Sequence, residues 1–487
     1  MGSEANPNSG GDVPTIVTRV PKHWQRLVTL PSEFAAKVQE MILQLKKVGK
    51  DDPRRVIHSL KVALAITIVS AFYYLNPLYD GFGSSGIWAV FTVVFVSEFS
   101  VGATLGKGVN RGIATLSGSA LGLGCYYMVC LISRGDHTTV EPVLLGVITF
   151  LSSAGATYLR FLPQLKVRYD YGLLIFILTF SFVSLSSYRE SNIQEIVKKR
   201  IITILTGCLI SVSVCIFVCP IWAGGDLHNL VSKNIEKLGN FIEGFGKEYF
   251  TTSEVGESNI KSYMQGYKSV LDSKQVEQNL ANLAKWEPCH GRFRFHHPWQ
   301  QYLKIGNLTR QCAFRIDALN GFLNSTMAPL EIRSKIQDPC MKMSTELGMA
   351  LKELAVSIQK MIPPCAAEPH IAISKIAAAK LRSMIQTGLW EGTNLFEVVP
   401  VVTMASLLLD VVSCTERLAE SIQELSSLAK FKHKESKIAA ENSENPHDQE
   451  EAPQSASCDN RGPHHVIAIN QPCTNLSHDG KSQLLRS

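Results

Sequence analysis

The chain has 487 residues, of which 45% are hydrophobic and 18% charged, and its formal net charge is +6 at pH 7. Its Lys and Arg residues are spread along the sequence, which excludes the concentrated basic face of a nucleic-acid-binding protein. The 12 cysteines form no CxxC pair, and no GxxxxGK[ST] or HExxH motif is present. We therefore expect neither an enzyme nor a bound metal or cofactor.

Residues 1–50 are predicted to form an amino-terminal cytosolic tail. The tail starts with a stretch rich in Gly, Pro, Ser and Asn, without the apolar run of a signal peptide. Further on, apolar residues recur at helical spacing, at Phe34, Val38, Met41, Ile42 and Leu45. This pattern predicts an amphipathic helix on the membrane surface, which ends at the charged residues 51–55.

Residues 51–222 contain six apolar runs that are separated by short polar segments. The runs are residues 56–75, 86–96, 112–132, 143–162, 171–187 and 201–222. Four of them approach or exceed the roughly 17 to 25 residues that a helix needs to cross a bilayer, whereas the second is short and the fifth is marginal. We predict an all-α membrane protein in which six transmembrane helices are followed by a helical cytosolic domain.

The distribution of Lys and Arg between the predicted loops gives the orientation. Ten of these residues flank the spans on the amino-terminal side of the membrane, and five lie on the opposite side, at Arg134, Arg189, Lys198, Lys199 and Arg200. Because cytoplasmic loops carry the excess of positive residues, both termini are expected in the cytosol.

Several of these cations lie close to the predicted hydrocarbon. A cation at the centre of a membrane helix costs about 2.5 to 3.5 kcal/mol unless it meets water or a counter-charge, and rings of Arg and Lys select anions. The candidates for an anion pore are Lys107, Arg111, Arg160, Lys166, Arg168, Lys198 and Arg200. Ordinary topology signals and phospholipid contacts are the alternative interpretation. The many small residues of the third run fit either close helix packing or a narrow pore wall.

Residues 223–433 have the spacing of about six amphipathic helices, and residues 434–487 are polar enough to be disordered. The predicted helices are residues 226–250, 258–285, 298–323, 330–361, 371–389 and 395–431. Residues 286–299 form a loop that is dense in aromatic and ionisable side chains. A structural clamp is the favoured interpretation of this loop over a metal site, because the adjacent His296 and His297 need not converge.

Three carboxylates lie in the predicted outer loops, at Asp80, Glu190 and Glu195. Clustered carboxylates could bind a multivalent external cation such as Al³⁺ through oxygen. Acidic residues that are simply solvated are the common alternative.

Six short motifs, in the same order, resemble the plant aluminium-activated malate transporter family. They are residues 51–58 (DDPRRVIH), 79–83 (YDGFG), 87–90 (IWAV), 98–108 (EFSVGATLGKG), 168–172 (RYDYG) and the triplet Trp286, Glu287 and Pro288. The resemblance covers about residues 51–430. It implies a homodimeric channel for malate and inorganic anions, with a helical cytosolic domain and pore-lining positions on the basic residues named above. Ala114 departs from the pattern, since many relatives have glycine there.

Two other functions stay open at this point. A coupled carrier for organic acids would share the basic pathway but would move its substrate by alternating access. A membrane receptor without transport would leave the cations on the outer side at Arg200 unexplained. Among membranes, we expect the plasma membrane rather than the vacuolar membrane.

Overall fold

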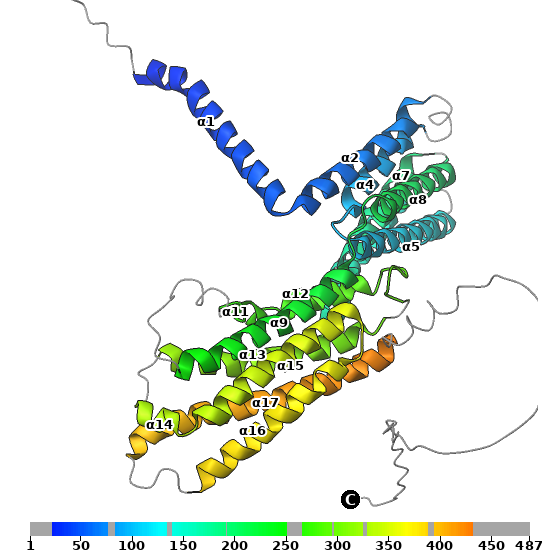
Figure 1. The fold of residues 1–487 in the computed structure, drawn as a ribbon. Coiled ribbons are helices and arrows are strands. Elements are labelled where there is room, and N and C mark those ends of the chain that lie inside the picture. Colours follow the sequence, from blue (N-terminus) through cyan, green and yellow to red (C-terminus); the bar gives the residue numbers. More distant parts are fainter. Residues whose placement is uncertain are drawn as a thin grey trace, which may run out of the picture. The chain divides into compact units, whose positions relative to one another are not determined.

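The computed structural model describes residues 22–75, 83–133, 139–190, 192–250, 265–294, 297–324, 329–387 and 394–431. All elements of regular structure in these ranges are helices (Figure 1). The first group comprises α1 (Lys22–Asp51), α2 (Pro53–Tyr74), the short η1 (Gly83–Gly86), α4 (Ile87–Val96), α5 (Val101–Ser133), α6 (Val140–Leu159), α7 (Pro163–Arg189) and α8 (Ile193–Phe217). The second comprises α9 (Ala223–Phe250), α11 (Lys268–Leu271), α12 (Lys274–Ala284), α13 (Trp299–Asn324), α14 (Leu330–Ser334), α15 (Gln337–Lys360), η2 (Pro364–Ala366), α16 (Glu368–Gln386) and α17 (Leu395–Ala429).

Five described helices are long and apolar enough to cross a membrane: α5, α6, residues Arg168–Arg189 of α7, α8 and α17. The second predicted span is the helix α4, whose 10 residues reach only about 15 Å at 1.5 Å per residue. The hydrocarbon core is about 30 Å thick, so α4 is too short to cross it alone. The prediction of an all-α membrane protein is confirmed, whereas its six complete spans are not.

Three helices begin well before the apolar runs that predicted them. The third run, residues 112–132, belongs to α5 (Val101–Ser133), and the fifth, residues 171–187, belongs to α7 (Pro163–Arg189). The sixth run, residues 201–222, lies in α8 (Ile193–Phe217) up to Phe217 and extends five residues beyond its end. Apolar runs stop at charged residues, but a helix continues through a charge whose side chain has room and suitable neighbours. Lys107, Arg111, Lys198 and Arg200 therefore lie within helices rather than at their ends.

The small residues of α5 bring this helix close to α7. A Cβ atom added to Gly118 would lie 3.1 Å from the carbonyl oxygen of Phe176, and one added to Gly122 would lie 2.9 Å from the side chain of Val183. Neither position has room for a larger side chain. Of the two interpretations of these small residues, close helix packing describes Gly118 and Gly122.

The second group of helices surrounds a large apolar core. Its fully buried side chains come from α9, α13, α15 and α17 and include Phe241, Tyr302, Leu351 and Leu408. The helix α17 is apolar enough for a membrane span, but it packs against α13, α15 and α16 within this core. A helix enclosed by others is expected to be apolar on most of its surface, which explains its composition without a lipid contact.

Several predicted features lie outside the described residues. They include Asp80, Arg134, His296, the start of the predicted helix 258–285 and the predicted disordered tail 434–487.

Candidate functional site

Arg200 of α8 is buried among aromatic side chains. Only 2% of its surface is exposed, and the central carbon of its guanidinium lies 3.8 Å from the ring centroid of Trp88 and 3.8 Å from that of Phe182. Trp88 comes from α4 and Phe182 from α7, so three helices build this arrangement. The two rings are inclined to each other by 68° and both lie against the cation, while its Nε and Nη1 atoms have no hydrogen-bond partner.

Arg111 of α5 is the second buried arginine, with 3% of its surface exposed. Its Nη1 donates a hydrogen bond of 3.0 Å to the hydroxyl of Tyr171, and its Nε is buried without a partner. Arg111 and Arg200 interact electrostatically. Neither forms an ion pair with a carboxylate of the described residues, so the two cations carry an uncompensated positive charge.

The other predicted pore cations differ in their surroundings. Lys107 forms an ion pair with Glu98, and its ammonium lies 5.5 Å from the ring of Tyr171. Arg160 binds Asp170 through two hydrogen bonds of 2.8 and 3.2 Å. These two residues have their counter-charges within the chain.

Lys166, Arg168 and Lys198 are all exposed. The guanidinium carbon of Arg168 lies 5.3 Å from the ring of Trp286. The structure thus brings Arg111 near Arg200 and, through Tyr171, near Lys107. It does not gather all seven predicted cations at one place.

Sequence reasoning missed the partners of these cations. Trp88, Glu98 and Tyr171 belong to the motifs IWAV, EFSVGATLGKG and RYDYG, so their place beside the cations could have been suspected. Phe182 carried no such signal, because it is one of several aromatic residues in an apolar run.

The two described carboxylates of the predicted external cation site lie at adjacent ends of two helices. Glu190 follows the last residue of α7, Glu195 lies in the first turn of α8, and both are exposed. Among the described residues, no group of three or more His, Cys, Asp or Glu side chains could hold a metal ion.

Glu287 connects the start of α9 with the loop that precedes α13. Its Oε1 accepts a hydrogen bond of 2.6 Å from the amide of Ala223, and its Oε2 accepts one of 3.0 Å from that of Gly224. The carboxylate thereby caps two of the unpaired amides at the amino terminus of α9. Burial raises the pKa of Glu287, and these two backbone hydrogen bonds oppose the rise.

Trp286 and its neighbours also contact α5. A Cβ atom added to Gly106 would lie 3.2 Å from the indole of Trp286, and one added to Gly102 would lie 2.2 Å from the carbonyl oxygen of Leu283. Residues 283–287 comprise the end of α12 and the first residues after it, and we call them the docking loop. They rest directly on the first turns of the helix that carries Lys107 and Arg111.

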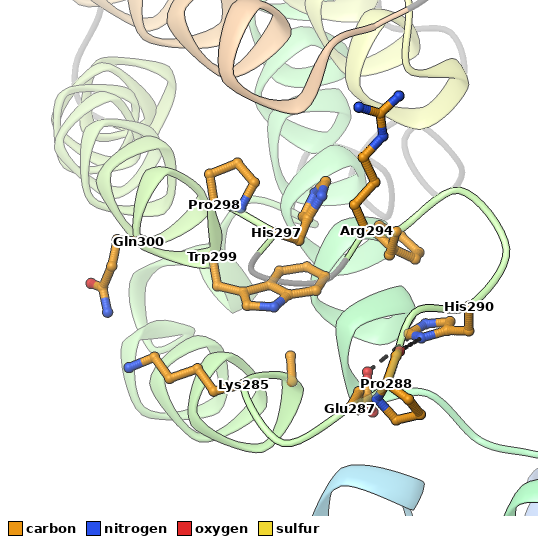
Figure 2. A pocket seen from close by; sticks show the side chains of 11 residues that line it. Lys285, Glu287, Pro288, His290, Arg294, His297, Pro298, Trp299 and Gln300 are labelled. Carbon is orange, nitrogen blue, oxygen red and sulfur yellow. Dashed lines mark hydrogen bonds and ion pairs between the residues drawn. The ribbon is translucent and has the colours of Figure 1, made fainter.

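A cavity of about 190 Å³ lies beside the docking loop. Figure 2 shows the indole of Trp299 between His297 and Lys285. A dashed line in the same figure marks the interaction between Glu287 and His290. The imidazole of His290 stacks on Trp222, with ring centroids 3.7 Å apart and an angle of 6° between the rings. This aromatic cluster holds the residue before α9 and the start of α9 against the loop.

Tyr171 gives the first testable expectation, because its hydroxyl accepts the hydrogen bond of buried Arg111. The change Tyr171→Phe should lower stability by about 1.5 to 3 kcal/mol, the range for hydrogen bonds to charged groups. The melting temperature of the purified protein measures the loss. Tyr158→Phe is the control, since Tyr158 is 72% exposed. Equal melting temperatures of the two variants would contradict the role of the hydroxyl.

His297 predicts a dependence of stability on pH. Burial, followed by the nearby His228 and His290, lowers the pKa of His297 from 6.5 to about 4. Between these values the unfolded chain binds a proton that the folded chain does not, so this contribution is complete above pH 6.5 and is lost as the pH falls toward 4. The drop in melting temperature over this interval should be smaller in His297→Gln than in the unchanged chain. Titration of Glu287 and His228 is common to both proteins, so equal drops would contradict the assignment to His297.

The chain is similar to known proteins over most of its length. The family model for aluminium activated malate transporters matches residues 46–390. Aluminum-activated malate transporter 2 of Arabidopsis thaliana is 47% identical over 403 residues, which cover 82% of this chain and 80% of the relative. Aluminum-activated malate transporter 1 of Triticum aestivum is 42% identical over 402 residues, covering 80% and 86%.

Proposed function

The chain belongs to the aluminium-activated malate transporter family, and we propose that it is a channel through which malate and other organic or inorganic anions cross a membrane. The names of its relatives describe malate transporters, and the long apolar helices make the chain a multi-pass membrane protein. Transport without chemical conversion also agrees with the absence of an enzymatic motif in the sequence.

The burial of Arg111 and Arg200 without a carboxylate partner carries this proposal. Both lie in helices long and apolar enough to span a bilayer, where an uncompensated charge is costly. An anion that passes beside them would supply the missing negative charge, and the unpaired Nε of each residue and Nη1 of Arg200 are donors that it could use. A dicarboxylate such as malate can interact with two cations at once, which a monovalent anion cannot do to the same extent.

In the proposed pathway, the seven cations predicted from the sequence have different roles. Arg111 and Arg200 attract the anion, because their charge is free. Lys107 and Arg160 already pair with Glu98 and Asp170, so they contribute less to the local potential. Exposed Lys166, Arg168 and Lys198 fit a role at the mouths of the pathway, where electrostatic steering raises the local anion concentration.

The proposed assembly is a homodimer in the plasma membrane, with both termini in the cytosol. The arrangement of Lys and Arg between the predicted loops supports this orientation. An epitope tag at either terminus should be reachable by antibody only after the membrane of intact cells is permeabilised.

The decisive experiment measures current and malate flux in the same cells under a malate gradient. A channel predicts a current whose reversal potential follows the malate equilibrium potential. Malate uptake without such a current would instead support a coupled, electroneutral carrier. Absence of both, in protein shown to reach the surface, would contradict transport and favour a receptor.

A further inference from the structure

The helix α1 carries an apolar stripe that no other part of the described chain covers. Within its 30 residues, Phe34, Val38, Met41, Leu45 and Val48 follow one another at intervals of four and three positions, which places them on one face. Their exposed fractions are 70%, 37%, 59%, 65% and 41%. A continuous apolar stripe of this length is not expected to remain in water.

Basic residues accompany the stripe. Within residues 34–51, four lysines, at positions 37, 46, 47 and 50, outnumber the acidic residues Glu40 and Asp51. Lys37 lies near the edge of the apolar stripe, whereas Lys46, Lys47 and Lys50 lie away from it. An apolar face with lysines beside and behind it is the pattern of a helix that lies in the interface of an anionic bilayer.

The end of α1 is tied to the membrane helices. Only Asp52 separates α1 from α2, and its carboxylate accepts a hydrogen bond of 3.2 Å from the amide of Arg54. The side chain of Arg54 pairs with Asp226 at 3.0 Å, in the first turn of α9 and shortly after α8 has ended. The carboxyl end of α1 is thus held beside the first turn of α9, shortly after the apolar helix α8 has ended.

From these observations we propose that α1 lies in the membrane interface on the side where α2 enters, with its stripe among the acyl chains and its lysines on anionic lipid headgroups. The bilayer is the occupant because α1 is joined through Asp52 alone to α2, which holds the first predicted span, and because the charge of an anionic bilayer is opposite to that of the lysines. Each lysine near such a surface contributes about 1 kcal/mol, in addition to the burial of the apolar face. This proposal is independent of what the protein transports.

The test places a photoreactive benzoylphenylalanine at Met41, on the stripe, or at Gln39, on the opposite face, in the full-length protein. Both side chains are exposed, so neither change disturbs a core. The protein is reconstituted in phosphatidylcholine vesicles with and without phosphatidylserine, irradiated and examined by mass spectrometry. We expect lipid adducts several-fold more abundant at Met41 than at Gln39, with an increase when phosphatidylserine is present.

The triple change Lys46→Gln, Lys47→Gln and Lys50→Gln should remove the increase that phosphatidylserine causes, while leaving most of the adduct formed in phosphatidylcholine. Adducts between Met41 and a second copy of the chain would overturn the proposal, since the stripe would then be a protein interface. Equal labelling at Met41 and Gln39 would overturn it as well, because a helix free in solution shows no preferred face.

Discussion

Replacement of Arg200 by alanine is expected to reduce the malate current at least about tenfold, which corresponds to about 1.4 kcal/mol. The guanidinium is the most deeply buried cation of the candidate pathway, at 2% exposure, and two of its nitrogens are free. Its removal leaves Trp88 and Phe182 facing an apolar space that offers an anion no favourable interaction. Current normalised to surface protein is the measurement.

Two further variants separate charge from geometry. Arg200→Lys keeps the charge but loses the planar group that lies against both rings, so it should retain part of the current with altered selectivity between malate and chloride. Lys199→Gln removes an adjacent charge that is exposed and should leave both quantities nearly unchanged. Native current and selectivity in Arg200→Ala would show that the anion does not pass beside this residue.

The different positions of Arg200 in the prediction and in the structure show what the sequence can and cannot reveal. Long apolar runs and charged motifs are local features, so the all-α membrane class, the helical second group and the family could be predicted. The partners of a cation are not local: Trp88 and Phe182 reach Arg200 from α4 and α7. Without that information, the residue was predicted at the outer start of an apolar run instead of inside α8.

The same limit explains why the sequence does not separate the paired cations from the unpaired ones among the seven candidates. Lys107 and Arg160 differ from Arg111 in their greater exposure and in their partners Glu98 and Asp170, and both differences depend on how the chain packs. The sequence also places the starts of α5 and α8 too late. An apolar run begins only after the last charged residue, whereas the backbone hydrogen bonds of these helices continue through charged residues. The clamp interpretation of the loop at Glu287 rested on its composition, and its contacts with α5 became visible only in the structure.

The contact between the docking loop and α5 leads to the second large expected effect, in Gly102→Ala. The added Cβ would lie 2.2 Å from the carbonyl oxygen of Leu283 and 3.0 Å from Cγ of Glu287. Because the nearest atom belongs to the backbone, the loop itself must move, at a cost of about 1 to 3 kcal/mol for overpacking. We expect a lower melting temperature and a large loss of current per protein at the surface.

Gly124→Ala provides a matched control in the same helix, because a Cβ at Gly124 has no neighbour within 4 Å. Alanine is favoured over glycine within a helix by about 1 kcal/mol, so this variant should keep or raise the stability. Displacement of the loop by Gly102→Ala would also withdraw Glu287 from the amides of Ala223 and Gly224, which loosens the start of α9. Equal melting temperatures and equal currents in Gly102→Ala and Gly124→Ala would show that the docking loop does not contact α5 in the functioning protein. The two groups of helices would then have to contact each other elsewhere.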